Sequence, residues 1–289
     1  MISVVKLIRP HQWVKNLFLL IPVFFAGQIF TTEHAMDLVA GFFVFCFISS
    51  SVYVINDLKD APVDRLHPKK KTRPIASGKV SVGTAIFTLV VLAILGFGLS
   101  LTLPRQFTIL ALTYYVLNIA YSFGLKKVAI LDMMILSFGF ILRVFAGGIL
   151  GDVPVSEWLA IMIFLLSLFL AVAKRRDDVL IFEQSGTVSR SSTANYNLSF
   201  INAALTMIAG IIIVAYMLYT ILSDVKQRIP SDYLYGTSIF VVTGILRYLQ
   251  ITLVNNDSSS PVKILYSDLF IQLTLIFWVL SYFYLLYVS

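Results

Sequence analysis

The sequence predicts an all-α membrane protein, a bundle of nine transmembrane helices. Of its 289 residues, 58% are hydrophobic and only 13% are charged, which is roughly half the charged share of a soluble domain. Apolar runs of about 20 residues, the length that crosses a bilayer as a helix, recur along the chain, and the short alternating strands of a closed barrel are missing from it. We predict spans at approximately residues 13–31, 38–56, 81–103, 106–123, 129–150, 155–173, 198–222, 233–254 and 265–287.

The loops between these spans predict their orientation, because lysine and arginine collect in cytoplasmic loops. Of the 22 basic residues, 17 lie in the N-terminal segment and the even-numbered loops, and only three lie in the odd-numbered loops. We therefore expect a cytoplasmic N-terminus, an outside C-terminus and an active site that faces the cytoplasm from the cell inner (plasma) membrane. The net charge of +7, distributed in this way, suits anionic headgroups or phosphates and not nucleic acid. Its oligomeric state is left open.

We treat residues 1–289 as a single transmembrane domain with two polar cytoplasmic loops, at about 56–80 and 174–197. The first contains the stretch NDLKDAPVDRLHPKKKTRPIASG, which places three carboxylates beside six cations at the end of an apolar run. If the preceding helix continues, Asn56, Asp60 and Asp64 recur at i, i+4 and i+8 and share one face. Pro62 removes a helical hydrogen bond, so we expect a kink or a helix restart there.

Carboxylates this close repel one another unless a cation lies among them, and Asp57 adds a third beside the same face. Mg²⁺ is the expected cation, because it takes one or two carboxylates and completes its octahedron with water and phosphate oxygens. The alternative is a solvated loop that follows the positive-inside rule. That alternative accounts for the lysines but not for regularly spaced acids at the membrane end of a helix. We therefore predict that Asn56, Asp57, Asp60 and Asp64 bind magnesium, and that Arg65, Lys69 and Arg73 bind phosphate.

The second polar loop opens with Lys174-Arg175-Arg176-Asp177-Asp178. One interpretation is a basic helix end that anchors at the membrane interface. The other, which we favour, is a second wall of the same anion and metal site. Its candidates for phosphate binding are Lys174 and Arg175, and its further candidates for metal binding are Asp177 and Asp178.

Polar residues at membrane depth are expensive and therefore informative. Arg143 lies within FILRVFAGG, and we expect it to face a polar cavity, in a functional role or in an ion pair. Tyr121 and Lys126 approach the cytoplasmic end one helix earlier, and we include all three among the phosphate-binding candidates. Arg247 can instead reach the interface or pair with an acid from another helix. The nearby glycines at 147, 148 and 151 favour close helix packing.

These motifs resemble those of the UbiA superfamily of intramembrane prenyltransferases. Residues 56–64, Asn-Asp-Leu-Lys-Asp-Ala-Pro-Val-Asp, match its NDxxDxxxD motif. Within the superfamily, the opening Arg9-Pro10-His11-Gln12-Trp13-Val14-Lys15-Asn16, the run from Asp64 to Lys69 followed by Arg73 to Gly78, and the stretch from Ala173 to Arg176 resemble the decaprenyl-phosphate phosphoribosyltransferase branch. Asp177 and Asp178 are adjacent, whereas aromatic-acceptor enzymes usually have a DxxxD second motif.

This resemblance implies an enzyme that transfers 5-phosphoribose from phosphoribosyl pyrophosphate to a polyprenyl phosphate, with Mg²⁺ as its cofactor. It implies that Asp57, Asp60 and Asp64 are the catalytic aspartates, and it adds Lys15 and Asn16 to the phosphate-binding candidates. Two alternatives stay open. One is an aromatic prenyltransferase that uses a polyprenyl diphosphate. The other is a transporter or lipid-handling protein, which would also place charges inside a helical bundle.

Overall fold

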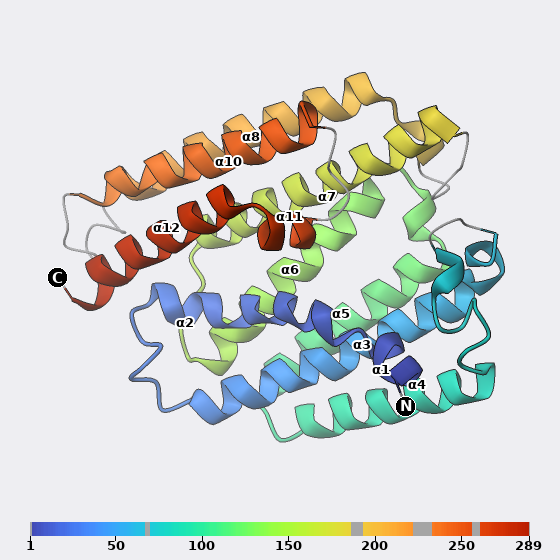
Figure 1. Ribbon diagram of the computed structural model, residues 1–289. Helices are drawn as coiled ribbons and strands as arrows, with labels where there is room; N and C mark the ends of the chain where they lie inside the picture. The colour runs from blue at the N-terminus through green and yellow to red at the C-terminus, as the bar shows by residue number, and fades with distance from the viewer. Residues whose placement is uncertain (1, 67–69, 186–192, 222–232, 256–260, 289) are drawn as a thin grey trace. The chain divides into compact units, whose positions relative to one another are not determined.

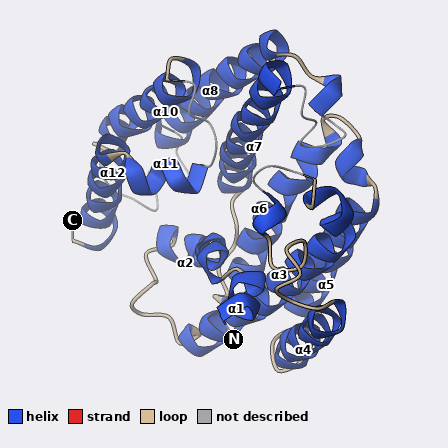
Figure 2. Ribbon diagram, turned by 45° about the vertical axis from the view of Figure 1, so that its right-hand side comes forward, coloured by secondary structure: helices blue, strands red, loops and turns tan. Residues whose placement is uncertain are grey.

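The computed structural model describes residues 2–66, 70–185, 193–221, 233–255 and 261–288, and this part of the chain is helical, without a β-strand (Figure 2). The chain divides into two compact units, Met1–Val155 and Ser156–Ser289. Each unit is described by itself below.

The first unit is built around one long helix, α3, which contacts α1, η1, α4, α5 and α6 (Figure 1). The elements of this unit are α1 (Ile2–Ile8), η1 (Pro10–Leu20), α2 (Ile21–Phe25), α3 (Ala35–Asp64), η2 (Lys70–Thr72), α4 (Val82–Ser100), α5 (Arg105–Phe123), η3 (Leu125–Lys127) and α6 (Leu131–Leu150), where η denotes a 3₁₀-helix.

The second unit packs its helices in chain order, α7 against α8, α8 against α10 and α10 against α12. Its elements are α7 (Glu157–Ser185), η4 (Thr193–Asn195), α8 (Leu198–Ile221), η5 (Leu234–Thr237), α10 (Ser238–Leu253), α11 (Pro261–Ser267) and α12 (Leu269–Tyr287). Asp268 caps α12 by accepting a hydrogen bond from the Ile271 backbone N–H at 2.9 Å. The same carboxylate accepts one from Arg247 at 2.7 Å. Of the two alternatives for Arg247, the structure thus shows the pairing with an acid.

Seven helices of the described residues are long and apolar enough to cross a membrane: α3, α4, α6, α7, α8, α10 with the turn before it, and α12. The prediction of nine spans is therefore not confirmed. The predicted span 106–123 forms the helix α5, whose three tyrosines and one asparagine lower its hydropathy. The predicted span 13–31 is wrong as a single helix, because the 3₁₀-helix η1, which begins at Pro10, is followed by the short α2, whose second residue is Pro22. Proline has no N–H to continue the preceding hydrogen-bond ladder.

The end of α3 also differs from the prediction. We expected the span to end near residue 56 and the chain to kink or restart at Pro62, whereas one continuous helix runs through Pro62 to Asp64. Because Pro62 lies in the last turn, the helix loses a single backbone hydrogen bond there. The consequence is that the whole acidic motif is helical.

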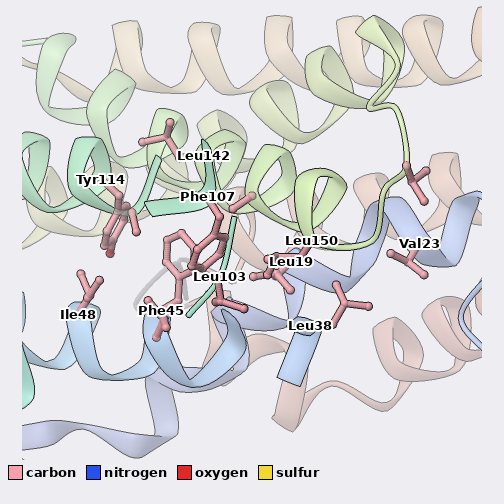
Figure 3. Close-up of a cluster of buried hydrophobic side chains, with 14 residues drawn as sticks. Leu19, Val23, Leu38, Phe45, Ile48, Leu103, Phe107, Tyr114, Leu142 and Leu150 are labelled. Carbon is pink, nitrogen blue, oxygen red and sulfur yellow. The ribbon is translucent and has the colours of Figure 1, made fainter. Parts of the chain in front are cut away.

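The core of the first unit consists of aromatic and aliphatic side chains from α3, α5, α6 and η1 (Figure 3). Phe45 of α3 meets Phe107 and Tyr114 of α5 edge to face, with ring centroids 5.9 and 5.5 Å apart. Leu142 and Leu150 of α6 complete this cluster. This cluster packs α3 against α5 and α6, on the N-terminal side of the acidic motif that ends α3.

Close packing of α6 on η1 depends on glycine, as the sequence predicts. A Cβ atom at Gly147 would overlap the backbone carbonyl of Leu19, and one at Gly151 would overlap the side chain of Val23. Helices approach this closely in membranes where small residues line the contact. The η1 segment, which carries Lys15 and Asn16, is therefore held directly against the α6 backbone.

Substitution of Gly147 by alanine is expected to destabilise the protein by about 2 kcal/mol, since overpacking a tight contact costs about 1–3 kcal/mol. Gly98→Ala is the matched control, because a Cβ atom there meets nothing within 4 Å. It should be neutral or stabilise α4 by about 0.5 kcal/mol. Unfolding in detergent, followed by tryptophan fluorescence, compares the two variants. Equal stabilities would contradict the close contact of α6 with η1.

Candidate active site

The acidic motif lies on the last turns of α3. Because the helix continues to Asp64, Asn56, Asp60 and Asp64 follow one another at successive turns, as predicted from their spacing. Asp57 and Asp64 are only 1% and 3% exposed. Buried carboxylates need positive partners. Two cations of the first unit pair with Asp57 and Asp64, and a third pairs with Asp60.

Arg9 is the first of these cations. Its Nη2 donates to both carboxylate oxygens of Asp57, at 2.6 and 2.8 Å, and its guanidinium lies 5.1 Å from the ring centroid of Tyr53. The Arg9 backbone is in the left-handed region, with φ 58° and ψ 58°, directly between α1 and η1. Leu7, fully buried against α3 and its neighbours, anchors this turn. Our site prediction omitted Arg9, although the arginine-proline pair that opens the N-terminal motif was available as a signal.

Arg73 is the second cation. Its Nη1 donates to Asp57 at 3.1 Å and to Asp64 at 2.7 Å, so one nitrogen joins two carboxylates. The loop that carries Arg73 is fixed by the buried side chains of Ile75 and Val80, which pack in the same cluster as Leu7. Arg73, predicted as a phosphate-binding residue, thus lies on the acidic motif itself.

Lys126 of η3 is the third cation. Its Nζ donates to Asp60 Oδ1 at 2.5 Å and to Asn56 Oδ1 at 3.2 Å. The turn after α5 thereby contacts the face of α3 that the spacing predicted. Lys126 too was predicted to bind phosphate, and the structure brings it to the carboxylates.

The oxygen atoms of the motif converge in two pairs, each on one cationic nitrogen. Asp57 and Asp64 meet at Arg73, and Asn56 and Asp60 meet at Lys126. Among the residues that the structure describes, no group of three His, Cys, Asp or Glu side chains is close enough to hold a metal. The donors nevertheless suit Mg²⁺, which takes one or two carboxylates and fills its other positions with water and phosphate. The four side chains would bind Mg²⁺ as two separate pairs of ligands and not as one four-ligand site.

A second polar cluster lies deeper in the first unit, around Arg143. This side chain, 4% exposed, donates to Asn16 Oδ1 at 2.8 Å, to the Gly139 carbonyl at 2.8 Å and to the Tyr114 hydroxyl at 2.9 Å. Its guanidinium also lies 4.5 Å from the ring centroid of Tyr114. Asn16 in turn donates to the Cys46 sulfur at 3.3 Å.

The partners of Arg143 are thus all neutral, and it is separate from the acidic motif. Lys15, next to Asn16 in the chain, lies near enough to Arg143 and Arg9 for their charges to interact. Within the described ranges, neither Lys15 nor Arg143 forms an ion pair with a carboxylate. Two cations therefore lie near each other without a carboxylate partner in the part of the chain that the structure describes, an arrangement that favours a bound anion.

The other predicted residues of the first unit lie near the motif or outside the description. Arg65 is exposed and directly follows α3, and Tyr121 is buried in α5. Lys69 lies outside the described residues.

In the second unit, the predicted second motif lies on α7 and not in a loop. Arg175 is fully buried and donates to Asp178 at 2.9 Å. Arg176 donates through Nε to Asn202 of α8 at 2.8 Å. Lys174 is exposed, and Asp177 is partly buried.

The fold and the site define an integral membrane protein with an acidic, cation-paired motif at the end of one of its apolar helices. A model of the UbiA prenyltransferase family matches residues 19–259, and the chain belongs to this family.

Curated relatives make the likeness more specific. The chain is 33% identical over 288 residues to a decaprenyl-phosphate phosphoribosyltransferase of Mycolicibacterium smegmatis, covering 96% of this chain and 90% of the relative. It is also 33% identical over 283 residues to the enzyme of that name from Corynebacterium glutamicum, covering 96% and 84%. In fold, it is similar to a UbiA homologue from Archaeoglobus fulgidus solved with GPP and Mg²⁺, with a TM-score of 0.72, 19% identity, and 98% and 99% of the two chains covered.

Proposed function

We propose that this protein transfers 5-phosphoribose from phosphoribosyl pyrophosphate to a polyprenyl phosphate and releases pyrophosphate, in a Mg²⁺-dependent step of lipid-linked sugar synthesis for the cell envelope. The observation that carries the proposal is the pair of cations Lys15 and Arg143, which have no carboxylate partner among the described residues and lie apart from the acidic motif of α3. Two such sites suit an enzyme whose donor and acceptor are both anions. The relatives that share 33% of its residues support a phosphate as the acceptor anion.

The acidic motif is the proposed site of the donor. Asp57, Asp60 and Asp64, with Asn56, would hold Mg²⁺, which neutralises the diphosphate and makes it a better leaving group. The cations Arg73 and Lys126 lie within hydrogen-bonding distance of those carboxylates. They are therefore placed to contact the phosphate oxygens that the metal leaves free.

The cluster around Lys15 is the proposed site of the acceptor phosphate. Each of the three nitrogens of the Arg143 guanidinium already donates to a protein group, so the main contribution of Arg143 would be its positive charge and its hydrogen bond to Asn16. Lys15 has a flexible stem and an ammonium group without a protein acceptor in the described residues, so it would make the direct contact. A buried charge raises anion affinity more than an exposed one because the local dielectric constant is lower.

The reaction needs little proton transfer. An oxygen of the lipid phosphate would attack C1 of the ribose, while the bond from C1 to the pyrophosphate oxygen breaks and its electron pair leaves with pyrophosphate. A phosphate monoester is already largely a dianion at neutral pH, because its second pKa is about 6. The work of the protein is then positioning and charge stabilisation.

The remaining residues complete the proposal on the strength of the sequence motifs. We retain Lys174 and Arg175 of α7, together with Arg65, Lys69 and Tyr121, as phosphate-binding candidates, and Asp177 and Asp178 as further metal-binding candidates. The charge distribution supports a site that opens to the cytoplasm from the inner membrane.

Transfer of label from phosphoribosyl pyrophosphate to polyprenyl phosphate by the purified protein in detergent tests the proposal. We expect a lipid-linked phosphoribose that forms with Mg²⁺ and is lost when the metal is chelated. Absence of this product, in a preparation that prenylates an aromatic acid from a polyprenyl diphosphate, would replace the proposed reaction with that of an aromatic prenyltransferase. Turnover that survives chelation would remove the metal from the proposal.

A further inference from the structure

The carboxylates proposed to bind metal are already neutralised by arginines. Asp57 accepts two hydrogen bonds from Arg9 and one from Arg73, and Asp64 accepts one from Arg73. A divalent cation bound to these carboxylates would lie beside the guanidinium groups, and like charges this close repel one another. Metal and arginine therefore compete for Asp57 and Asp64, and metal binding is expected to displace the guanidinium groups.

Arginines displaced in this way would remain next to the metal. Arg9 is tethered by the buried Leu7 on one side and by η1 on the other, and Arg73 is held by Ile75 and Val80. Both side chains are about one-quarter exposed, at 22% and 25%. They can therefore turn from the carboxylates without leaving the site. Guanidinium groups beside a bound Mg²⁺ suit the planar, bidentate recognition of phosphate oxygens.

The backbone of Arg9 adds an independent observation. A left-handed conformation is unfavourable at a residue other than glycine, and Arg9 adopts it with φ 58°. The turn aims the side chain at Asp57, 48 residues later in the chain. Strain of this kind persists where the surrounding structure fixes it, commonly at binding sites.

We propose that Arg9 and Arg73 are diphosphate-binding residues that Asp57 and Asp64 hold in place until a divalent cation takes those carboxylates. Arg9 thereby becomes a ligand-contacting residue contributed by the N-terminal segment. The inference rests on the proposed metal and diphosphate site but not on which diphosphate the enzyme uses. It predicts opposite effects on two affinities. Each arginine lowers the affinity for the metal when no diphosphate is present, and it raises the affinity for diphosphate when the metal is bound.

Two titrations of the full-length protein in detergent test this assignment, with Arg9→Gln, Arg73→Gln and the control Arg105→Gln. Arg105 is an exposed arginine at the start of α5, so its substitution changes the net charge equally. The first titration follows Mn²⁺ alone by electron paramagnetic resonance. The second follows inorganic pyrophosphate at saturating Mg²⁺ by calorimetry.

We expect Arg9→Gln and Arg73→Gln to bind Mn²⁺ about tenfold more tightly and magnesium pyrophosphate about tenfold more weakly than the wild type, because each substitution removes one cation that competes with the metal and contacts the diphosphate. Arg105→Gln should leave both affinities unchanged. Affinities that fall together in both variants would overturn the proposal, since the arginines would then only organise the aspartates. Shifts no larger than those of Arg105→Gln would overturn it as well.

The two variants protect the test against a folding defect, because Arg73 lies in a loop outside the long helices. The titrations also separate this inference from the proposed reaction. Opposite shifts in a protein that transfers no phosphoribose would keep the inference and discard the reaction. Shifts of the same sign in an active transferase would discard the inference alone.

Discussion

Asp57→Asn is expected to lower the turnover number about a thousand-fold while the protein remains folded. The substitution keeps the shape of the side chain but removes the buried charge that meets Arg9 and Arg73. Losing one electrostatic group of an active site costs about 10²- to 10³-fold in rate, and a lost metal ligand adds to that. The measurement is label transfer at saturating Mg²⁺, with thermal unfolding of the same preparation as the check on folding.

Asp37→Asn is the matched control for this prediction. Asp37 lies in the first turn of the same helix, and its carboxylate is 46% exposed beside His34. Turnover of this control should equal that of the wild type. A wild-type rate in Asp57→Asn itself would remove the aspartate from the proposed site.

Lys15→Met is expected to raise the KM for polyprenyl phosphate about 10- to 100-fold, because a hydrogen bond between charged groups is worth about 1.5–3 kcal/mol. The KM for phosphoribosyl pyrophosphate should change much less, since the proposed donor site lies on α3. Thermal stability should stay equal or rise, because an ammonium without a protein acceptor in the described residues is costly to bury. Separate substrate titrations and a melting curve give the three values.

The same substitution at Lys6, an exposed residue of α1, serves as its control. It removes the same charge and adds the same apolar side chain near the N-terminus. The prediction fails if Lys15→Met raises both KM values equally, or if it unfolds the protein. In either case Lys15 would organise the fold and not the acceptor.

Much of the helical architecture followed from the sequence. Each long apolar helix satisfies its own backbone hydrogen bonds, so an apolar run predicts a helix without any knowledge of tertiary contacts. Predicted spans from 38–56 onwards all overlap helices, although α7 continues to Ser185 and the last predicted span begins in α11 and crosses into α12. The first span did not form one helix, because η1 is fixed by tertiary contacts. Asn16 accepts from Arg143, and the Leu19 carbonyl lies against Gly147. Neither contact leaves a local pattern in the sequence.

In the candidate site, too, local sequence predicted some features and tertiary contacts decided the others. Helical spacing alone aligned Asn56, Asp60 and Asp64, since neighbours at i and i+4 share a face wherever the helix forms. The partners of these residues were decided only by the tertiary structure.

Arg9 reaches Asp57 across 48 residues, and Lys126 reaches Asp60 across 66. Arg143 reaches Asn16 across 127 residues. The sequence by itself determined which residues could carry the chemistry and how the acidic motif is spaced. Only the packing of α1, α5 and α6 around α3 decided which charges meet, because contacts between distant segments depend on how the helices pack and not on local spacing.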